Sequence, residues 1–102
     1  MAFAYTYDVP IGEDVYRKIE DGIGPEPPEG LVTHVAMRLP GGGLRYIDVW
    51  RSQAECERFV EERLHPVVHP IVEELLGFMP PEPEHTPLDV IHVWGEGGTF
   101  DA

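Results

Sequence analysis

The sequence predicts a single α+β domain over residues 1–102, with a four-stranded antiparallel sheet and two helices on one face of it. Apolar and polar residues alternate in four short segments, as they do in half-buried strands. Two other segments have helical spacing, and stretches rich in proline or glycine separate the elements. In chain order these segments form the β-α-β-β-α-β arrangement of a ferredoxin-like domain.

The first strand and helix are short. Aromatic residues alternate with smaller ones over Ala2–Val9, and Pro10 ends this strand. From Gly12 to about Gly22 apolar residues recur at helical spacing, and two acidic residues stand near the positive end of the helix dipole. The three prolines between Gly22 and Gly30 predict a loop that leads to the second strand.

Two alternating runs around Pro40–Gly43 predict a β-hairpin. A three-residue glycine loop would set the opposed pairs Pro40–Leu44, Arg38–Tyr46, Ala36–Asp48 and His34–Trp50. These side chains share one face, because side chains alternate with period two. The other face is aliphatic and consists of Val35, Met37, Leu39, Ile47 and Val49. We expect the aliphatic face to pack under the helices and the mixed face to be open.

A capping box begins the second helix, with Ser52 and Glu55 satisfying amide groups at its first turn. The apolar stripe that follows contains two prolines, each of which lacks an amide donor. We therefore expect a break or kink between Leu64 and Ile71, with Gly77 closing the last turn.

The C-terminal quarter contains a loop and the last strand. Four prolines make Met79–Pro87 an extended surface loop. Alternation over Leu88–Trp94 predicts the fourth strand, which would add His92 and Trp94 to the mixed face of the hairpin. The glycine-rich tail Gly95–Ala102 is expected to be loose or to reach across to a partner subunit.

Composition excludes several classes of partner. Nineteen acidic and seven basic residues give a formal charge of −12, which disfavours nucleic acids and anionic membranes. The single cysteine, Cys56, rules out an intrachain disulfide and fits a reducing compartment. The N-terminal apolar run lacks a basic region, and no window approaches the roughly 18 apolar residues of a membrane span. We expect a cytoplasmic protein.

The segments GLVTHVA and IDVWRSQAECERFVEERLHP, with the glycine turn between them, resemble small bacterial members of the dimeric α/β-barrel superfamily. Antibiotic-biosynthesis-monooxygenase-like proteins belong to this superfamily, and the resemblance covers nearly the whole chain. It implies a homodimer that packs sheet against sheet, with a pocket between each sheet and the helix after its third strand. The superfamily includes oxygenases, haem-degrading enzymes, lactone isomerases and ligand-binding regulators, so the fold alone does not define an activity.

Ionisable residues on the mixed face are the candidates for chemistry. His34 and His92 are expected to point into the pocket, where an imidazole could act as general base toward a phenolic or enolic substrate. A partly buried histidine that only makes hydrogen bonds is the alternative. Asp48 could orient the imidazole of His34, or it could form a structural salt bridge with Arg38.

Aromatic residues and the remaining histidines have two interpretations each. Tyr46, Trp50 and Trp94 could stack on a planar ligand or fill a dimer interface. His65 and His69 stand four residues apart, but the prolines between and after them disturb the helical geometry that a metal pair needs. We expect no metal site there and place one of them, His69, at the pocket entrance.

The leading hypothesis is a small-molecule enzyme of the monooxygenase-like kind that uses neither metal nor organic cofactor. Its substrate would be planar and aromatic or polyketide-like. His34, Asp48 and Arg38 would be catalytic, and the residues expected to hold the substrate are Tyr46, Trp50, His92, Trp94 and His69. The alternatives are a non-catalytic ligand-binding or structural dimer, and a haem-binding protein.

Overall fold

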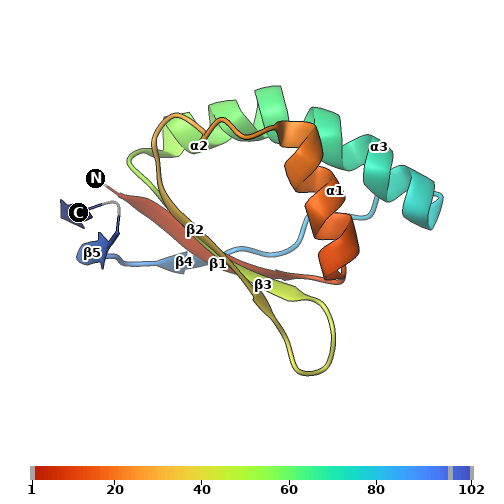
Figure 1. The fold of residues 1–102 in the computed structure, drawn as a ribbon, viewed down its shortest axis with the longest axis horizontal. Helices are drawn as coiled ribbons and strands as arrows, with labels where there is room; N and C mark the ends of the chain where they lie inside the picture. The colour runs from red at the N-terminus through yellow and green to blue at the C-terminus, as the bar shows by residue number, and fades with distance from the viewer. Residues whose placement is uncertain (1, 97, 102) are drawn as a thin grey trace.

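The computed structural model describes residues 2–96 and 98–101. In these residues the chain forms a four-stranded antiparallel sheet of order β2-β3-β1-β4, with the helices on one side of it (Figure 1). The strands of this sheet are β1 (Phe3–Val9), β2 (Leu31–Arg38), β3 (Leu44–Trp50) and β4 (Thr86–Leu88). The helices are α1 (Glu13–Ile23), α2 (Gln53–Phe59), the π-helix η1 (Val60–Leu64) and α3 (His65–Leu76). This α+β architecture is compatible with the ferredoxin-like fold expected from the sequence.

The hairpin of β2 and β3 has a register two residues away from the predicted one. Its opposed pairs are Arg38–Leu44, Ala36–Tyr46 and His34–Asp48. The connection is therefore the longer loop 39–43, in which the Leu39 N–H donates to the Gly43 carbonyl at 3.1 Å. Gly43 has φ of +81°, and a Cβ there would stand 2.7 Å from the Val9 carbonyl oxygen. A shift of two residues leaves each side chain on its predicted face, so the two groups remain separate.

The prediction of which face is open is wrong. The mixed face lies under the helices: the Trp50 ring packs against Phe59 of α2 at 5.6 Å between centroids. Its indole N–H donates to the Tyr5 hydroxyl at 3.2 Å, and that hydroxyl contacts the Cys56 Sγ at 3.4 Å. The aliphatic face is the open one, with Val35 42% exposed.

Aromatic area explains this reversal. The aromatic residues of β1 lie on the same side as Trp50. Tyr5 forms a buried cluster with Trp50 and Cys56, and Phe3 and Tyr7 pack against this cluster. Burying large rings removes more apolar surface from water than burying short aliphatic chains. Buried polar groups of this face, such as the Trp50 indole and the Asp48 carboxylate, have hydrogen-bond partners there, which lowers the cost of burying them.

The chain stays helical from Gln53 to Leu76, so helical structure is not broken between Leu64 and Ile71, and a kink there stays a prediction. The irregularity lies one turn earlier, in the π-helix η1, and Pro66 and Pro70 lie within the continuous helical segment. The predicted helix signals are confirmed. The Glu55 N–H donates to the Ser52 Oγ at 3.2 Å, and Gly77 closes α3 in the left-handed conformation. None of the helices in residues 2–96 and 98–101 has the length and apolar character to cross a membrane.

The predicted fourth strand, Leu88–Trp94, is also wrong. The sheet strand β4 is shorter and earlier, and His92 and Trp94 belong to a separate hairpin of β5 (His92–Gly95) and β6 (Gly98–Asp101). The glycines of the intervening turn favour this local pairing, which closes a much shorter loop than pairing with β1 would. Most of the tail expected to be loose is thus paired, although Gly97 and Ala102 lie outside the described residues.

Candidate functional site

A chain of hydrogen bonds joins α1 to the centre of the sheet through His34. The Tyr16 hydroxyl of α1 lies 2.7 Å from His34 Nε2, and His34 Nδ1 is hydrogen-bonded to the Asp48 carboxylate. Asp48 is 6% exposed, whereas the His34 side chain is 32% exposed. The three residues, called here the Tyr16–His34–Asp48 chain, therefore run from a partly open surface to a buried carboxylate.

Strand pairing sets this geometry. His34 and Asp48 are directly opposed on β2 and β3, so their side chains leave the sheet on the same face. Tyr16 reaches them from the second turn of α1, and its ring lies nearly parallel to the imidazole at 5°. A second contact ties the same two elements together, because Arg38 at the end of β2 donates to Glu13 at the start of α1 with Nε at 3.0 Å.

The hydrogen bonds define the working tautomer of His34. A carboxylate only accepts, so Nδ1 carries the hydrogen that points at Asp48. In the neutral imidazole Nε2 is then an acceptor, and the Tyr16 hydroxyl donates to it. In this tautomer the lone pair of His34 lies on Nε2, which is on the more accessible side of the ring and accepts from Tyr16.

Aromatic rings continue from His34 along the helix side of the sheet. The Tyr46 ring lies 5.4 Å from the imidazole of His34, and the Tyr7 ring stands edge-on to Tyr46 at 5.1 Å. His85, from the segment before β4, stacks on Tyr7 at 4.1 Å and on Tyr5 at 4.6 Å. These rings of His34, Tyr46, Tyr7, Tyr5 and His85 are called the aromatic row.

The environment of the row keeps its phenols protonated. Burial raises the pKa of Tyr5, Tyr7 and Tyr46 well above the ordinary value, and the Asp48 carboxylate adds to the increase in each pKa. Burial also raises the pKa of Tyr16, with Glu20 adding to it. These hydroxyls therefore keep their protons at neutral pH, so each can donate a hydrogen bond to a ligand oxygen.

The structure brings only some of the predicted site residues together. His34, Asp48 and Tyr46 meet on the helix side of the sheet. Arg38 pairs with Glu13 rather than with Asp48, and its side chain is 77% exposed. Trp50 lies on the same face but in the core under α2.

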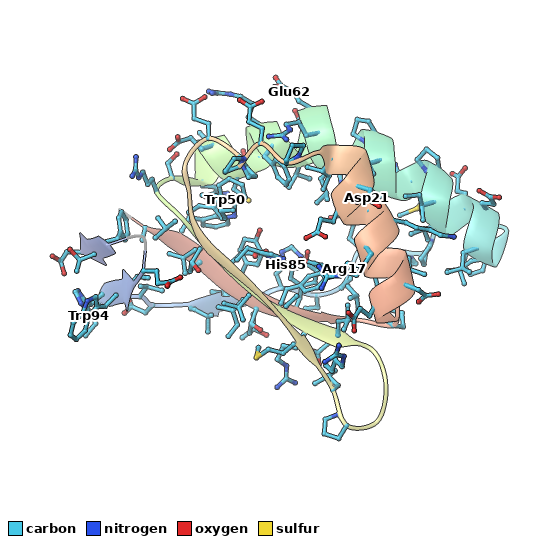
Figure 2. The ribbon with its side chains drawn as sticks, in the orientation of Figure 1. Arg17, Asp21, Trp50, Glu62, His85 and Trp94 are labelled. Atoms are coloured by element: carbon cyan, nitrogen blue, oxygen red, sulfur yellow. The ribbon has the colours of Figure 1, made fainter. Side chains whose placement is uncertain are left out.

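The other predicted binding residues lie elsewhere. His92 hydrogen-bonds to Asp101 across the C-terminal hairpin at 2.7 Å, and Trp94 in that hairpin is 82% exposed. Figure 2 shows Trp94 at the opposite end of the sheet from Arg17 of α1. His69 stacks on His65 along α3, and His65 in turn pairs with Glu82 at 2.6 Å.

Sequence reasoning missed Tyr16, Tyr7 and His85. Tyr16 had a weak signal, because it stood beside the apolar stripe of its helix in a position that faces the sheet. The alternation of β1 put Tyr7 on one face but did not indicate which face the helices cover. His85 had no signal in the sequence, because a proline-rich loop has no periodicity from which the position of a side chain could be predicted.

The described residues give little support to metal binding or to thiol chemistry. In the described ranges, 2–96 and 98–101, no group of three or more histidine, cysteine, aspartate or glutamate side chains could hold a metal ion. Burial raises the pKa of the Cys56 thiol, which disfavours the thiolate that a nucleophile needs. An open hollow of about 450 Å³ lies on the other face of the sheet, where Asp8 and Arg45 line it, away from His34.

The site is thus that of an α+β protein with a carboxylate-oriented histidine beside a row of protonated phenols. No family model, curated protein or solved structure matches the chain.

Alkaline titration tests the burial of the phenols. All four tyrosines of the chain have a raised pKa, so the folded state holds their protons where the unfolded state, with pKa near about 10, releases them. Their contribution to stability is complete below about pH 10 and falls as pH rises further. We expect tyrosinate absorbance at 295 nm to appear only with loss of the far-ultraviolet circular dichroism. A phenol that ionises near pH 10 in the folded protein would contradict this arrangement.

Proposed function

We propose that this protein is a homodimeric, small-molecule-binding member of the α/β-barrel type. We further propose that it is a cofactor-independent, monooxygenase-like enzyme for a planar aromatic or polyketide-like substrate. The Tyr16–His34–Asp48 chain is the observation that carries the proposal. The sequence resemblance supports the reaction class, and the geometry of the chain supports the roles proposed for its residues.

His34 is the general base in this proposal. Its Nε2, whose lone pair the Tyr16 hydroxyl must first release, removes a proton from an acidic carbon or hydroxyl of the substrate, and the imidazole becomes positively charged. The buried Asp48 carboxylate stabilises that charge and holds the ring in the tautomer that leaves Nε2 free to accept. An oriented histidine of this kind requires no metal to take up a proton.

Tyr16 has a complementary role. When Nε2 takes a proton it no longer accepts from the Tyr16 hydroxyl, which becomes available as a donor. The developing enolate oxygen of the substrate is a suitable acceptor, because a donor with a raised pKa stabilises the charge without losing its own proton.

Oxygen chemistry follows from the carbanion. For a substrate with an acidic methylene group, the carbanion transfers electrons to O2, one oxygen atom forms the new carbonyl and the other leaves as water. The substrate is oxidised by four electrons and O2 is reduced by four, so no external reductant is needed. The phenol rings of Tyr46 and Tyr7 present faces and edges that suit a planar substrate.

One observation favours a non-catalytic role instead. Both ring nitrogens of His34 have partners within the protein itself, and the chain links α1 to the sheet. A purely structural network would have the same hydrogen bonds. In that case His34 would contribute to stability, and its replacement would not affect any turnover.

Oxygen uptake with anthrone, a planar tricyclic ketone with an acidic methylene group, tests the catalytic proposal. We expect the protein to convert anthrone and O2 into anthraquinone and water. His34→Gln should lower kcat/KM by about 10²–10⁴-fold, because it removes the base. Asp48→Asn should lower it by about 10–100-fold, because the imidazole loses its orienting carboxylate.

The matched control is His92→Gln, which changes the same residue type in the distant C-terminal hairpin and should retain full activity. Folding of each variant is checked by circular dichroism. Full activity of a folded His34→Gln protein would overturn the assignment of the base, and absence of anthrone oxidation by the wild type would contradict this reaction for this substrate.

The dimer is proposed to form through the open face of the sheet. Exposed apolar side chains on this face come from two edge strands, with Val35 at 42%, Met37 at 36% and Leu88 at 36% exposure. The chain continues from Leu88 to Ile91, which is 82% exposed. A second copy would remove this apolar surface from water, which a 102-residue chain has limited means to do alone.

Light scattering coupled to size-exclusion chromatography tests the dimer. We expect the wild type to elute with twice the mass of one chain at micromolar concentration. Met37→Asp should shift the equilibrium to monomer, since a carboxylate would be buried in the interface without a partner. Lys18→Asp, on the exposed side of α1, is the control and should remain dimeric. A monomeric wild type would overturn this proposal.

A further inference from the structure

The His85 imidazole covers part of the aromatic row from a segment without regular secondary structure. The segment 77–85 connects α3 to β4, and His85 is its last residue. Its ring is close to parallel with the Tyr5 ring, at 12°, and with the Tyr7 ring, at 27°. Figure 2 shows His85 on the helix side of the sheet.

Stacking is the contact that holds this imidazole in place. Within residues 2–96 and 98–101, no hydrogen bond or ion pair fixes the side chain of His85, and the residue is exposed on its outer side. Three of the other four histidines differ in this respect, whereas His69 stacks on His65. His34 and His92 bond to aspartates, and His65 bonds to Glu82.

We propose that His85 occupies the place of a ligand ring, and that a planar, uncharged aromatic compound binds by displacing it from the faces of Tyr5 and Tyr7. This inference rests on the proposed function, because it concerns the ligand of the same site. The imidazole is itself a planar ring, so a planar ligand would preserve the stacking that His85 gives up.

The position of the stack relates it to the proposed base. Tyr7 is in edge contact with Tyr46, and Tyr46 is in contact with His34. A ligand with two or three fused rings, lying on Tyr7 and extending past Tyr46, would bring its far ring toward Nε2 of His34. A single-ring ligand in the place of His85 would not extend that far along the row.

Charge at the stack selects against anions. Burial raises the pKa of the Tyr7 phenol, and the carboxylates of Asp48 and Glu82 add to the increase, so acidic groups lie close enough to act on this ring. Glu84 is adjacent to His85 in the chain. A carboxylate or sulfonate on the ligand would be repelled, whereas a neutral phenol or ketone would not.

Proton NMR with 2-naphthol, a neutral two-ring phenol, tests the displacement directly. The ring protons of His85 should resonate upfield in the free protein, because they lie over tyrosine faces. Titration with 2-naphthol should move them saturably toward the position of an unstacked histidine. Decahydro-2-naphthol has the same carbon skeleton without the flat rings, and it should leave these signals unchanged.

A pair of variants gives the energetic test. His85→Ala removes the competing imidazole, and we expect it to bind 2-naphthol about two- to tenfold more tightly than the wild type does. His92→Ala removes an imidazole from the C-terminal hairpin and should bind 2-naphthol as the wild type does. Circular dichroism checks that both variants fold.

The outcomes separate this inference from the proposed function. If 2-naphthol shifts the His34 ring protons while those of His85 stay fixed, the ligand binds at the proposed site and the displacement is wrong. Weaker binding by His85→Ala would also overturn it, because His85 would then be a ligand contact. If 2-naphthol shifts no histidine signal, both the displacement and the proposed binding of planar ligands fail.

Discussion

The burial of Asp48 is the constraint on which the arrangement of this protein depends. Among residues 2–96 and 98–101, it is the only charged side chain in the buried set. An ionised carboxylate in the interior is stable only if it is paired and hydrogen-bonded. The position of its partner is therefore as constrained as the position of Asp48. His34 is that partner, and its second nitrogen in turn fixes Tyr16 and the helix that carries it.

This requirement also explains why the sheet faces the helices with its aromatic side. The side chains that alternate with the aliphatic ones include the large rings and the ionisable groups. Rings such as Trp50 gain most from burial, and polar groups such as Asp48 can be buried because their partners lie on the same face. The apolar side chains of the other face are left exposed, and a second copy of the chain is the cover that we propose for them.

The separation of the two hairpin faces could be predicted from the sequence, since it depends only on alternation. The side that the helices cover could not, because it depends on tertiary packing and on hydrogen bonds between distant residues. His34 and Asp48 were found as candidates because strand pairing brought them close in either register. The partners of Tyr16 and His85 could not be predicted, because a helix orientation and a loop path decide where these side chains lie.

The C-terminal prediction was wrong for a related reason. Alternation over Leu88–Trp94 predicts extended structure, which the chain adopts at Leu88 and again from His92, but alternation does not specify the pairing partner. The local hairpin of β5 and β6 takes His92 and Trp94 away from the site. The proposed catalysis therefore depends on one histidine, His34, rather than on His34 and His92.

The most direct test of this account is nitrogen-15 NMR of the His34 imidazole in the ligand-free protein at neutral pH. The account predicts two well-separated nitrogen shifts: a protonated Nδ1 with a slowly exchanging hydrogen, and an unprotonated Nε2 that accepts from Tyr16. In Asp48→Asn this preference for one tautomer should be lost or weakened. Averaged nitrogen shifts and rapid exchange of the ring hydrogen in the wild type would contradict the Tyr16–His34–Asp48 chain, and with it the proposed base.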